Sequence, residues 1–209
     1  LWGVWTMLDK ITGSFPRHTA KKEETLANGD TMEISVDGEP AMFVFKTVAD
    51  PFVGKMSYFK VMNGTIKRDM LMKNNTTGDS EKLAHIYIVN GKKQVEVDEL
   101  ACGDIGMVAK LSNTNTNDTL TWNNEFSYAP ITYPTPYYTR AMIPASAKDE
   151  GKISQSIAKM LEEDLTLKYD NDAETKQMLI SGLGDMHLAV LAAKLKNRFG
   201  VTVNYDVPK

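Results

Sequence analysis

Three prolines close together divide this chain into two halves with different sequence patterns. Pro130, Pro134 and Pro136 fall within residues 126–136. Because proline has no backbone N–H and fixes φ, this stretch is predicted to be an extended linker. Before it, short β-prone runs alternate with turn signals, whereas after it strands alternate with helices. The sequence therefore predicts two domains that meet at this linker.

Residues 36–125 are predicted to form an all-β barrel. Asn63-Gly64 and Asn90-Gly91 are strong turn signals between neighbouring strands. Many short strands at close, even spacing favour a closed barrel over an open sheet, because closure removes the edge strands. The β-prone runs are residues 42–45, 55–62, 83–89, 94–97 and 105–111.

Residues 137–209 are predicted to form an α+β domain. Two helical patterns cover residues 149–165 and 185–199, and Gly200 is placed to end the second helix. Short strands precede, separate and follow these helices, which gives the β-α-β-β-α-β order of ferredoxin-like folds. Both helices would then cover one face of the sheet and leave the other face free for a neighbour.

Residues 1–35 are predicted to be the remnant of a preceding domain followed by a linker. Residues 17–34 are polar, whereas the first residues repeat apolar side chains at helical spacing. Since the chain does not start with methionine, we expect it to be a piece of a longer protein. The helically spaced apolar residues are Leu1, Val4, Trp5, Leu8 and Ile11.

The charge balance limits the partners that this chain can attract. Its formal net charge is −3, so a general attraction to nucleic acid or to an anionic membrane is not expected. No apolar run approaches the roughly 20 residues needed to span a bilayer. Any RNA contact therefore needs a local basic patch. The candidates for such a patch are Lys55, Lys60, Lys67 and Arg68.

The motifs that would indicate chemistry are absent or weak. Neither a phosphate loop nor an Asn-Lys-x-Asp phrase is present, and the single cysteine, Cys102, excludes an internal disulfide framework. Gly182 and Gly184 precede a helix and could cradle an anion, but a tight strand-to-helix turn is the favoured interpretation. No catalytic residue, cofactor site or metal site is predicted.

His187 is the most informative titratable residue. Helical geometry places it on a polar stripe with Lys194 and Arg198, and it is predicted to take part in an interface rather than in catalysis or metal binding. An acidic run, Glu162-Glu163-Asp164, ends the preceding helix. This run is predicted to be a solvated helix face.

Several short sequence motifs occur in an order that points to a known family. Asp50-Pro51-Phe52-Val53-Gly54-Lys55 opens the first half, and Ser181-Gly182-Leu183-Gly184-Asp185-Met186-His187-Leu188 joins a strand to a helix in the second. Gly103-Asp104-Ile105-Gly106, Asp118-Thr119-Leu120 and Glu162-Glu163-Asp164 stand between them. Together these phrases resemble domains II and III of elongation factor G. Gly91-Lys92-Lys93-Gln94 is similar to the elongation factor G-like branch of that family.

The resemblance implies a cytoplasmic translational GTPase whose missing preceding domain binds GTP and magnesium. Domain II would rest on small-subunit ribosomal RNA and protein, and domain III would couple GTP hydrolysis to translocation. Asp164, Thr166, Gly184 and His187 match the family surface that faces the GTPase domain. The chain itself would be no enzyme, and neither a membrane nor DNA is an expected partner.

Three other functions remain open from the sequence. The first is a ribosomal protection or release-factor GTPase of the same superfamily, and the second is a free-standing RNA-binding barrel. The third is a ferredoxin-like acylphosphatase, which needs an arginine in the loop after the first strand. Here that loop is residues 144–147, and Arg140 lies inside the strand instead.

Overall fold

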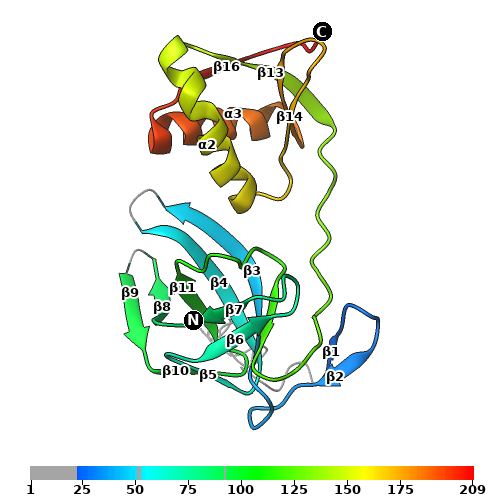
Figure 1. Ribbon diagram of the computed structural model, residues 1–209, viewed down its shortest axis with the longest axis vertical. Coiled ribbons are helices and arrows are strands. Elements are labelled where there is room, and N and C mark those ends of the chain that lie inside the picture. Colours follow the sequence, from blue (N-terminus) through cyan, green and yellow to red (C-terminus); the bar gives the residue numbers. More distant parts are fainter. Residues whose placement is uncertain (1–22, 51–52, 92) are drawn as a thin grey trace, which may run out of the picture. The chain divides into compact units, whose positions relative to one another are not determined.

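The computed structural model describes residues 23–50, 53–91 and 93–209 (Figure 1). They form two compact units, one within residues 23–131 and one made of residues 132–209 together with Thr47–Gly54. The helix predicted from the Trp-rich start lies outside the described residues. Within the described ranges, no helix is both long and apolar enough to cross a membrane.

The first unit is built on one large antiparallel sheet that curls around a core (Figure 1). The strand order is β7-β6-β12-β3-β4-β11-β8-β9, and a separate ladder pairs β5 (Thr65–Lys67) with β10 (Glu99–Ala101). The sheet strands are β3 (Ala41–Asp50), β4 (Gly54–Asn63), β6 (Leu71–Asn74), β7 (Ser80–Lys82), β8 (Ile86–Asn90), β9 (Lys93–Val97), β11 (Ile105–Ala109) and β12 (Thr119–Thr121).

Alternation along these strands explains which residues form the core. On β4, Phe59 and Val61 are fully buried on one face, and they pack with Val44, Ile66 and Leu120 from other strands. The predicted all-β barrel is therefore confirmed. It is a curled half-barrel and not the closed form that even strand spacing favoured, since no pairing among the described residues joins the end strands β7 and β9.

The predicted turn between β4 and β5 depends on Gly64. Its φ is 63°, in the left-handed region that favours glycine. A Cβ atom there would lie 2.4 Å from the carbonyl oxygen of Gly38, so no larger residue fits without moving the backbone. This turn brings β5 out of the large sheet and onto β10.

Two stretches that the sequence described as linkers are partly ordered on the first unit. Residues 23–33 form a hairpin of β1 (Glu23–Thr25) and β2 (Thr31–Glu33). Its Leu26 pairs with Tyr128, and both pack with Met32 and Phe126 against a buried apolar cluster. A few apolar side chains within these polar stretches pack on the first unit and so give them a defined structure. The average polarity of the stretches did not indicate this packing.

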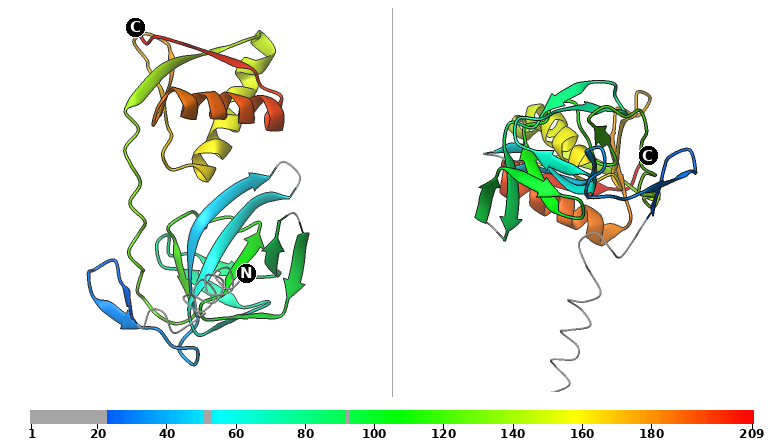
Figure 2. Two further views of the ribbon diagram at one scale, coloured as in Figure 1. Left: turned by 180° about the vertical axis from the view of Figure 1, so that it is seen from behind. Right: turned by 90° about the horizontal axis from the view of Figure 1, so that it is seen from below.

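The second unit confirms the predicted β-α-β-β-α-β order (Figure 2). Its antiparallel sheet has the order β14-β15-β13-β16, and both helices lie on the same side of it (Figure 2). The elements are β13 (Tyr138–Pro144), α2 (Ala147–Glu163), β14 (Lys168–Asn171), β15 (Met178–Gly182), α3 (Asp185–Lys194), the π-helical turn η1 (Leu195–Phe199) and β16 (Val203–Asp206).

The core of this unit lies between the helices and one face of the sheet. Ile153 and Ile157 of α2 are buried with Leu188 and Leu191 of α3 against Ile180 of β15. Gly200 ends the second helical segment as predicted, with φ 67°. The first helix stops at Glu163, two residues earlier than predicted.

Candidate functional site

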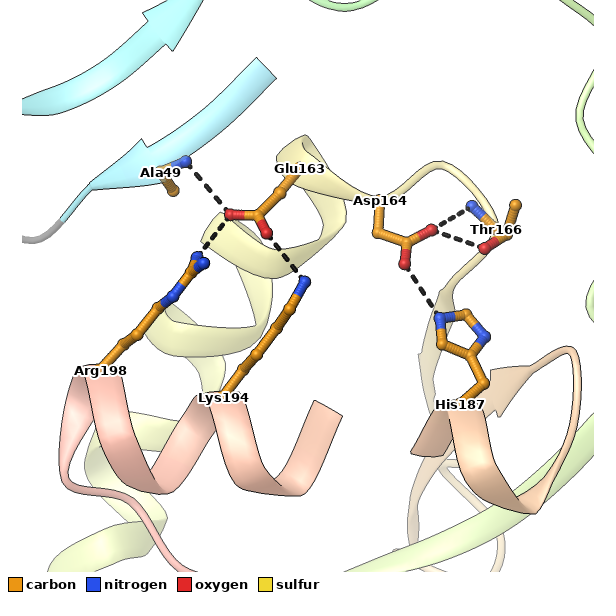
Figure 3. Close-up of polar contacts among 7 residues, drawn as sticks. All are labelled: Ala49, Glu163, Asp164, Thr166, His187, Lys194 and Arg198. Carbon is orange, nitrogen blue, oxygen red and sulfur yellow. Dashed lines mark hydrogen bonds and ion pairs between the residues drawn. The ribbon is translucent and has the colours of Figure 1, made fainter. Parts of the chain in front are cut away.

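The end of α2 and the start of α3 bring three of the candidate residues together. Asp164, the first residue after α2, accepts hydrogen bonds through Oδ1 from the backbone N–H and the hydroxyl of Thr166. Its other oxygen, Oδ2, lies 2.9 Å from His187 Nε2 (Figure 3). Thr166 thus fixes the carboxylate, and the carboxylate orients the imidazole.

The second ring nitrogen of His187 defines the tautomer. The backbone N–H of Leu183 donates to His187 Nδ1 at 3.1 Å. An acceptor nitrogen carries no proton, so in the neutral ring the proton resides on Nε2, which donates to Asp164. The ring is 19% exposed and is held at both ends.

Gly182 makes room for this ring. A Cβ atom at Gly182 would lie 3.0 Å from both His187 Nδ1 and a methyl carbon of Leu188. The predicted tight strand-to-helix turn is therefore present, and its close approach is at Gly182. Gly184 starts α3 and accepts the backbone N–H of Leu188 through its carbonyl, but a Cβ there would meet nothing within 4 Å.

Asp164 is held in its charged form. Its burial opposes ionisation, but the hydrogen bonds from Thr166 and His187 outweigh this and lower the pKa of the carboxyl group below its ordinary value. The site therefore presents a carboxylate that is already committed to two partners inside the unit. Such a group positions its neighbours and has little capacity left for acid–base chemistry.

Glu163 makes a second, more deeply buried ion-pair cluster beside the first. Its side chain is 9% exposed and contacts Lys194 Nζ at 2.9 Å and Arg198 Nη1 at 2.6 Å (Figure 3). The backbone N–H of Ala49, which groups with this unit, donates to the same carboxylate at 3.3 Å. Burial opposes ionisation, but the two basic side chains prevail and lower the pKa of Glu163.

The expected solvated acidic face is therefore wrong for two of its three residues. Glu162 is exposed, whereas Glu163 and Asp164 are turned toward α3 and η1. The sequence contained a signal for this pairing. The predicted polar stripe of His187, Lys194 and Arg198 is complementary in charge to the acidic run and offers it three partners. In a fold that packs both helices on one face, these two sets meet.

The surface around His187 is bordered by exposed apolar side chains. Leu183 is 51% exposed, Met186 76% and Val190 52%, and Leu165 beside Asp164 is 40% exposed. A cavity of about 20 Å³, enough for one water molecule, lies between α2 and α3 and is lined by Asp164, His187 and Val190 among others. The site is thus an apolar surface around a fixed polar pair, a form suited to docking rather than to enclosing a substrate.

The four basic candidates of the first unit are not gathered into one patch. Lys55 and Lys60 are five positions apart on β4, so their side chains leave opposite faces of the strand. Arg68 lies 3.4 Å from Asp98, 3.5 Å from Glu96 and 3.9 Å from Asp69. Lys67 is paired in register with Glu99. Nearby carboxylates therefore offset part of the positive charge.

The described residues give no support to a metal site or to acylphosphatase chemistry. No three His, Cys, Asp or Glu side chains gather there in a way that could hold a metal ion. Arg140 lies in β13, with its guanidinium 4.3 Å from the centre of the Tyr138 ring. It is stacked within the sheet and is no part of the loop that follows.

Comparison with known proteins gives two adjacent family matches. Residues 39–123 match the model of elongation factor G domain 2, and residues 133–207 match that of elongation factor G, domain III. A crystal structure of a protein from Thermus thermophilus is similar over 83% of this chain, with 31% sequence identity and a TM-score of 0.75. The match spans 26% of the length of that solved chain.

Proposed function

Because this chain belongs to the elongation factor G family, with its domain 2 followed by its domain III over residues 39–207, we propose that it is the docking and relay part of a translational GTPase. In this role the first unit rests on small-subunit ribosomal RNA and protein in the cytoplasm. The second unit couples GTP hydrolysis, carried out in a preceding GTPase domain, to translocation.

The observation that carries the proposal is the surface around His187. Three of the four residues expected to face a GTPase domain are joined through Asp164, and exposed apolar side chains surround them. Neighbouring exposed apolar side chains mark sites of protein–protein contact, and the polar pair among them is already hydrogen-bonded within the unit. Because Asp164 directly follows α2 and His187 lies in α3, movement of a docked partner would be transmitted to both helices.

Lys55, Lys60, Lys67 and Arg68 are proposed to contact the ribosomal RNA backbone singly. Their separation and their acidic neighbours favour a few isolated phosphate contacts over a continuous basic groove. Affinity for RNA alone would then be low and would fall with salt. Placement on the ribosome would depend on both units together.

The described residues offer no fitting site for GTP and magnesium. The sequence has no phosphate loop, and the described residues gather no acidic cluster for a metal ion. We therefore assign no hydrolytic step to any residue here. Turnover of GTP by the purified chain in the absence of ribosomes would contradict the assignment.

The proposal is tested by co-sedimentation of the purified chain with ribosomes. We expect the chain to pellet with ribosomes. Met186→Asp should weaken about tenfold the binding of the chain to an added GTPase domain of an elongation factor G, because a charge then enters the apolar border of the surface that faces that domain. Ala158→Asp, on an exposed position of α2, is the matched control and should bind like the parent. Thermal unfolding of both variants separates lost binding from lost folding. Absence of binding, or equal binding by both variants, would contradict the proposal.

A further inference from the structure

Met186 is the most exposed methionine of the described residues. It is 76% exposed at the start of α3, and Val190, four positions further on, lies on the same face of the helix. The chain has twelve methionines, of which Met7 lies outside the described residues. The other ten are buried or half-buried. Water and small solutes therefore reach Met186 far more easily than any other described methionine.

The thioether of an exposed methionine reacts with a peroxide without help from other side chains. One peroxide oxygen is transferred to the sulfur, which loses two electrons and becomes a sulfoxide, while hydrogen peroxide is reduced to water. The flexible apolar side chain thereby becomes polar and chiral. A methionine sulfoxide reductase reverses the change, because its thiols become a disulfide and the oxygen leaves as water. Met186 can therefore pass between two chemical states.

The single thiol of the chain competes poorly for the oxidant. Cys102 is 2% exposed, and its Sγ donates to the carbonyl oxygen of Met62 at 3.3 Å. Burial raises the pKa of the Cys102 thiol above its ordinary value. Because the thiolate is the reactive form, little of it is present at neutral pH. Oxidation is therefore expected at the exposed thioether before the buried thiol.

The fold of the second unit can accept a sulfoxide at Met186. Leu188 and Leu191 are the buried residues of α3, whereas Met186 takes no part in the apolar core of this unit. The added oxygen would lie in water. On Met142 or Met160, which are 2% exposed within that core, the same oxygen would have to be buried among apolar side chains. Oxidation of Met186 alone should therefore leave the stability of the unit unchanged.

We propose that Met186 is a reversible oxidation site for peroxides, and that its sulfoxide blocks docking on the surface around His187. The blocking rests on the proposed function, in which a GTPase domain covers this surface. On docking, the apolar border loses its water, and the sulfoxide oxygen would then be buried without a hydrogen-bond donor. A docked domain would in turn shield the thioether from peroxide. Oxidation and docking should therefore exclude each other.

The modification is tested by peptide mass mapping of the chain after graded exposure to hydrogen peroxide. We expect Met186 to gain one oxygen at least about tenfold faster than Met142 or Met160, with no change in Tm at the exposure that oxidises Met186 alone. Treatment with the two methionine sulfoxide reductases, one for each epimer, should restore the original mass. Equal rates at exposed and buried methionines, a lowered Tm, or a mass that the reductases leave unchanged would each overturn the proposal.

The effect on docking is tested by binding of the chain to an added GTPase domain of an elongation factor G, after the peroxide has been removed. We expect the oxidised chain to bind about tenfold more weakly and the reductases to restore its affinity. Met186→Leu should have the same affinity before and after peroxide, whereas Met178→Leu, which removes a half-buried methionine of β15, should show the loss seen in the parent. An undiminished affinity of the oxidised chain would overturn the proposal. Failure of the untreated chain to bind would instead contradict the proposed function, and the peptide map would still decide the modification.

Discussion

Removing the charge of Glu163 should destabilise the second unit far more than the same change one residue earlier. Glu163→Gln breaks a carboxylate that is 9% exposed and pairs with two bases, whereas Glu162→Gln alters an exposed side chain of the same helix. The two variants have identical chemistry and nearly the same position, so their difference isolates the ion-pair cluster.

The magnitude follows from burial. Breaking a fully buried pair by removing one partner costs about 3–5 kcal/mol, whereas an exposed pair is worth about 0–1 kcal/mol. Lys194 is 34% exposed and Arg198 33%, so water screens them in part and the cost lies between these limits. We expect about 2 kcal/mol for Glu163→Gln and under about 0.5 kcal/mol for Glu162→Gln.

The assay is thermal unfolding followed by circular dichroism at 222 nm. Both described α-helices belong to the second unit, so this helix-dominated signal reports mainly on that unit. For a domain of 60–100 residues, 1 kcal/mol corresponds to about 4–8 °C in Tm, which predicts a drop of about 8–16 °C for Glu163→Gln. Equal melting temperatures for the two variants would refute the reasoning, because the buried cluster would then contribute nothing.

Three further predictions concern the glycine contacts, the pH dependence and the first unit. Gly182→Ala should lower the free energy of unfolding by about 1–3 kcal/mol and displace the His187 ring, since the new Cβ would lie 3.0 Å from Nδ1. Gly184→Ala places its Cβ in open space and should lower it by under about 1 kcal/mol. Chemical denaturation measures both variants, and equal effects would contradict the packing. Glu163 and Asp164 have lowered pKa values in the folded state, so the stability that they contribute is present above the ordinary carboxyl pKa and is lost as the pH falls through the folded pKa. In urea unfolding below about pH 4, the double variant Glu163→Gln, Asp164→Asn should therefore lose less stability than the parent. An equal loss of stability would show that these two groups are not linked to folding. Gly64→Ala should lower the stability of the first unit by over about 2 kcal/mol, because the backbone there is left-handed and the new Cβ would lie 2.4 Å from a carbonyl oxygen. Gly78→Ala, also at positive φ but with no atom near its Cβ, is the control. Tryptophan fluorescence during urea unfolding measures both variants, and similar losses of stability would argue against the contact at Gly64.

The sequence predicted the fold of both halves because the signals are local. Asn63-Gly64 marks a real turn, the helical patterns of α2 and α3 are present, and Gly200 ends the second segment. The small misjudgements fall at element ends and in polar stretches such as residues 23–33, where two or three apolar contacts outweigh an unfavourable average.

The candidate site was predicted in part. Its residues lie in the phrases that the sequence singled out, and an interface role for His187 is consistent with its half-buried position. Its partners were not predicted, and neither was the order of importance of the two glycines. The sequence named Gly184 among the candidate residues, whereas the packing of His187 and Leu188 shows that the close approach is at Gly182.

The amino-acid sequence by itself determined two domains, their order and the class of each, because turn residues and apolar periodicity act over a few neighbouring positions. The tertiary structure decided which charged side chains are paired inside the second unit. Asp164 meets His187 across 23 positions, and Glu163 meets Lys194 and Arg198 across 31 and 35. Contacts at such separations depend on how the sheet places the two helices. Two of the three residues of an acidic run that looks solvated in the sequence, Glu163 and Asp164, therefore become partly buried and paired only after folding.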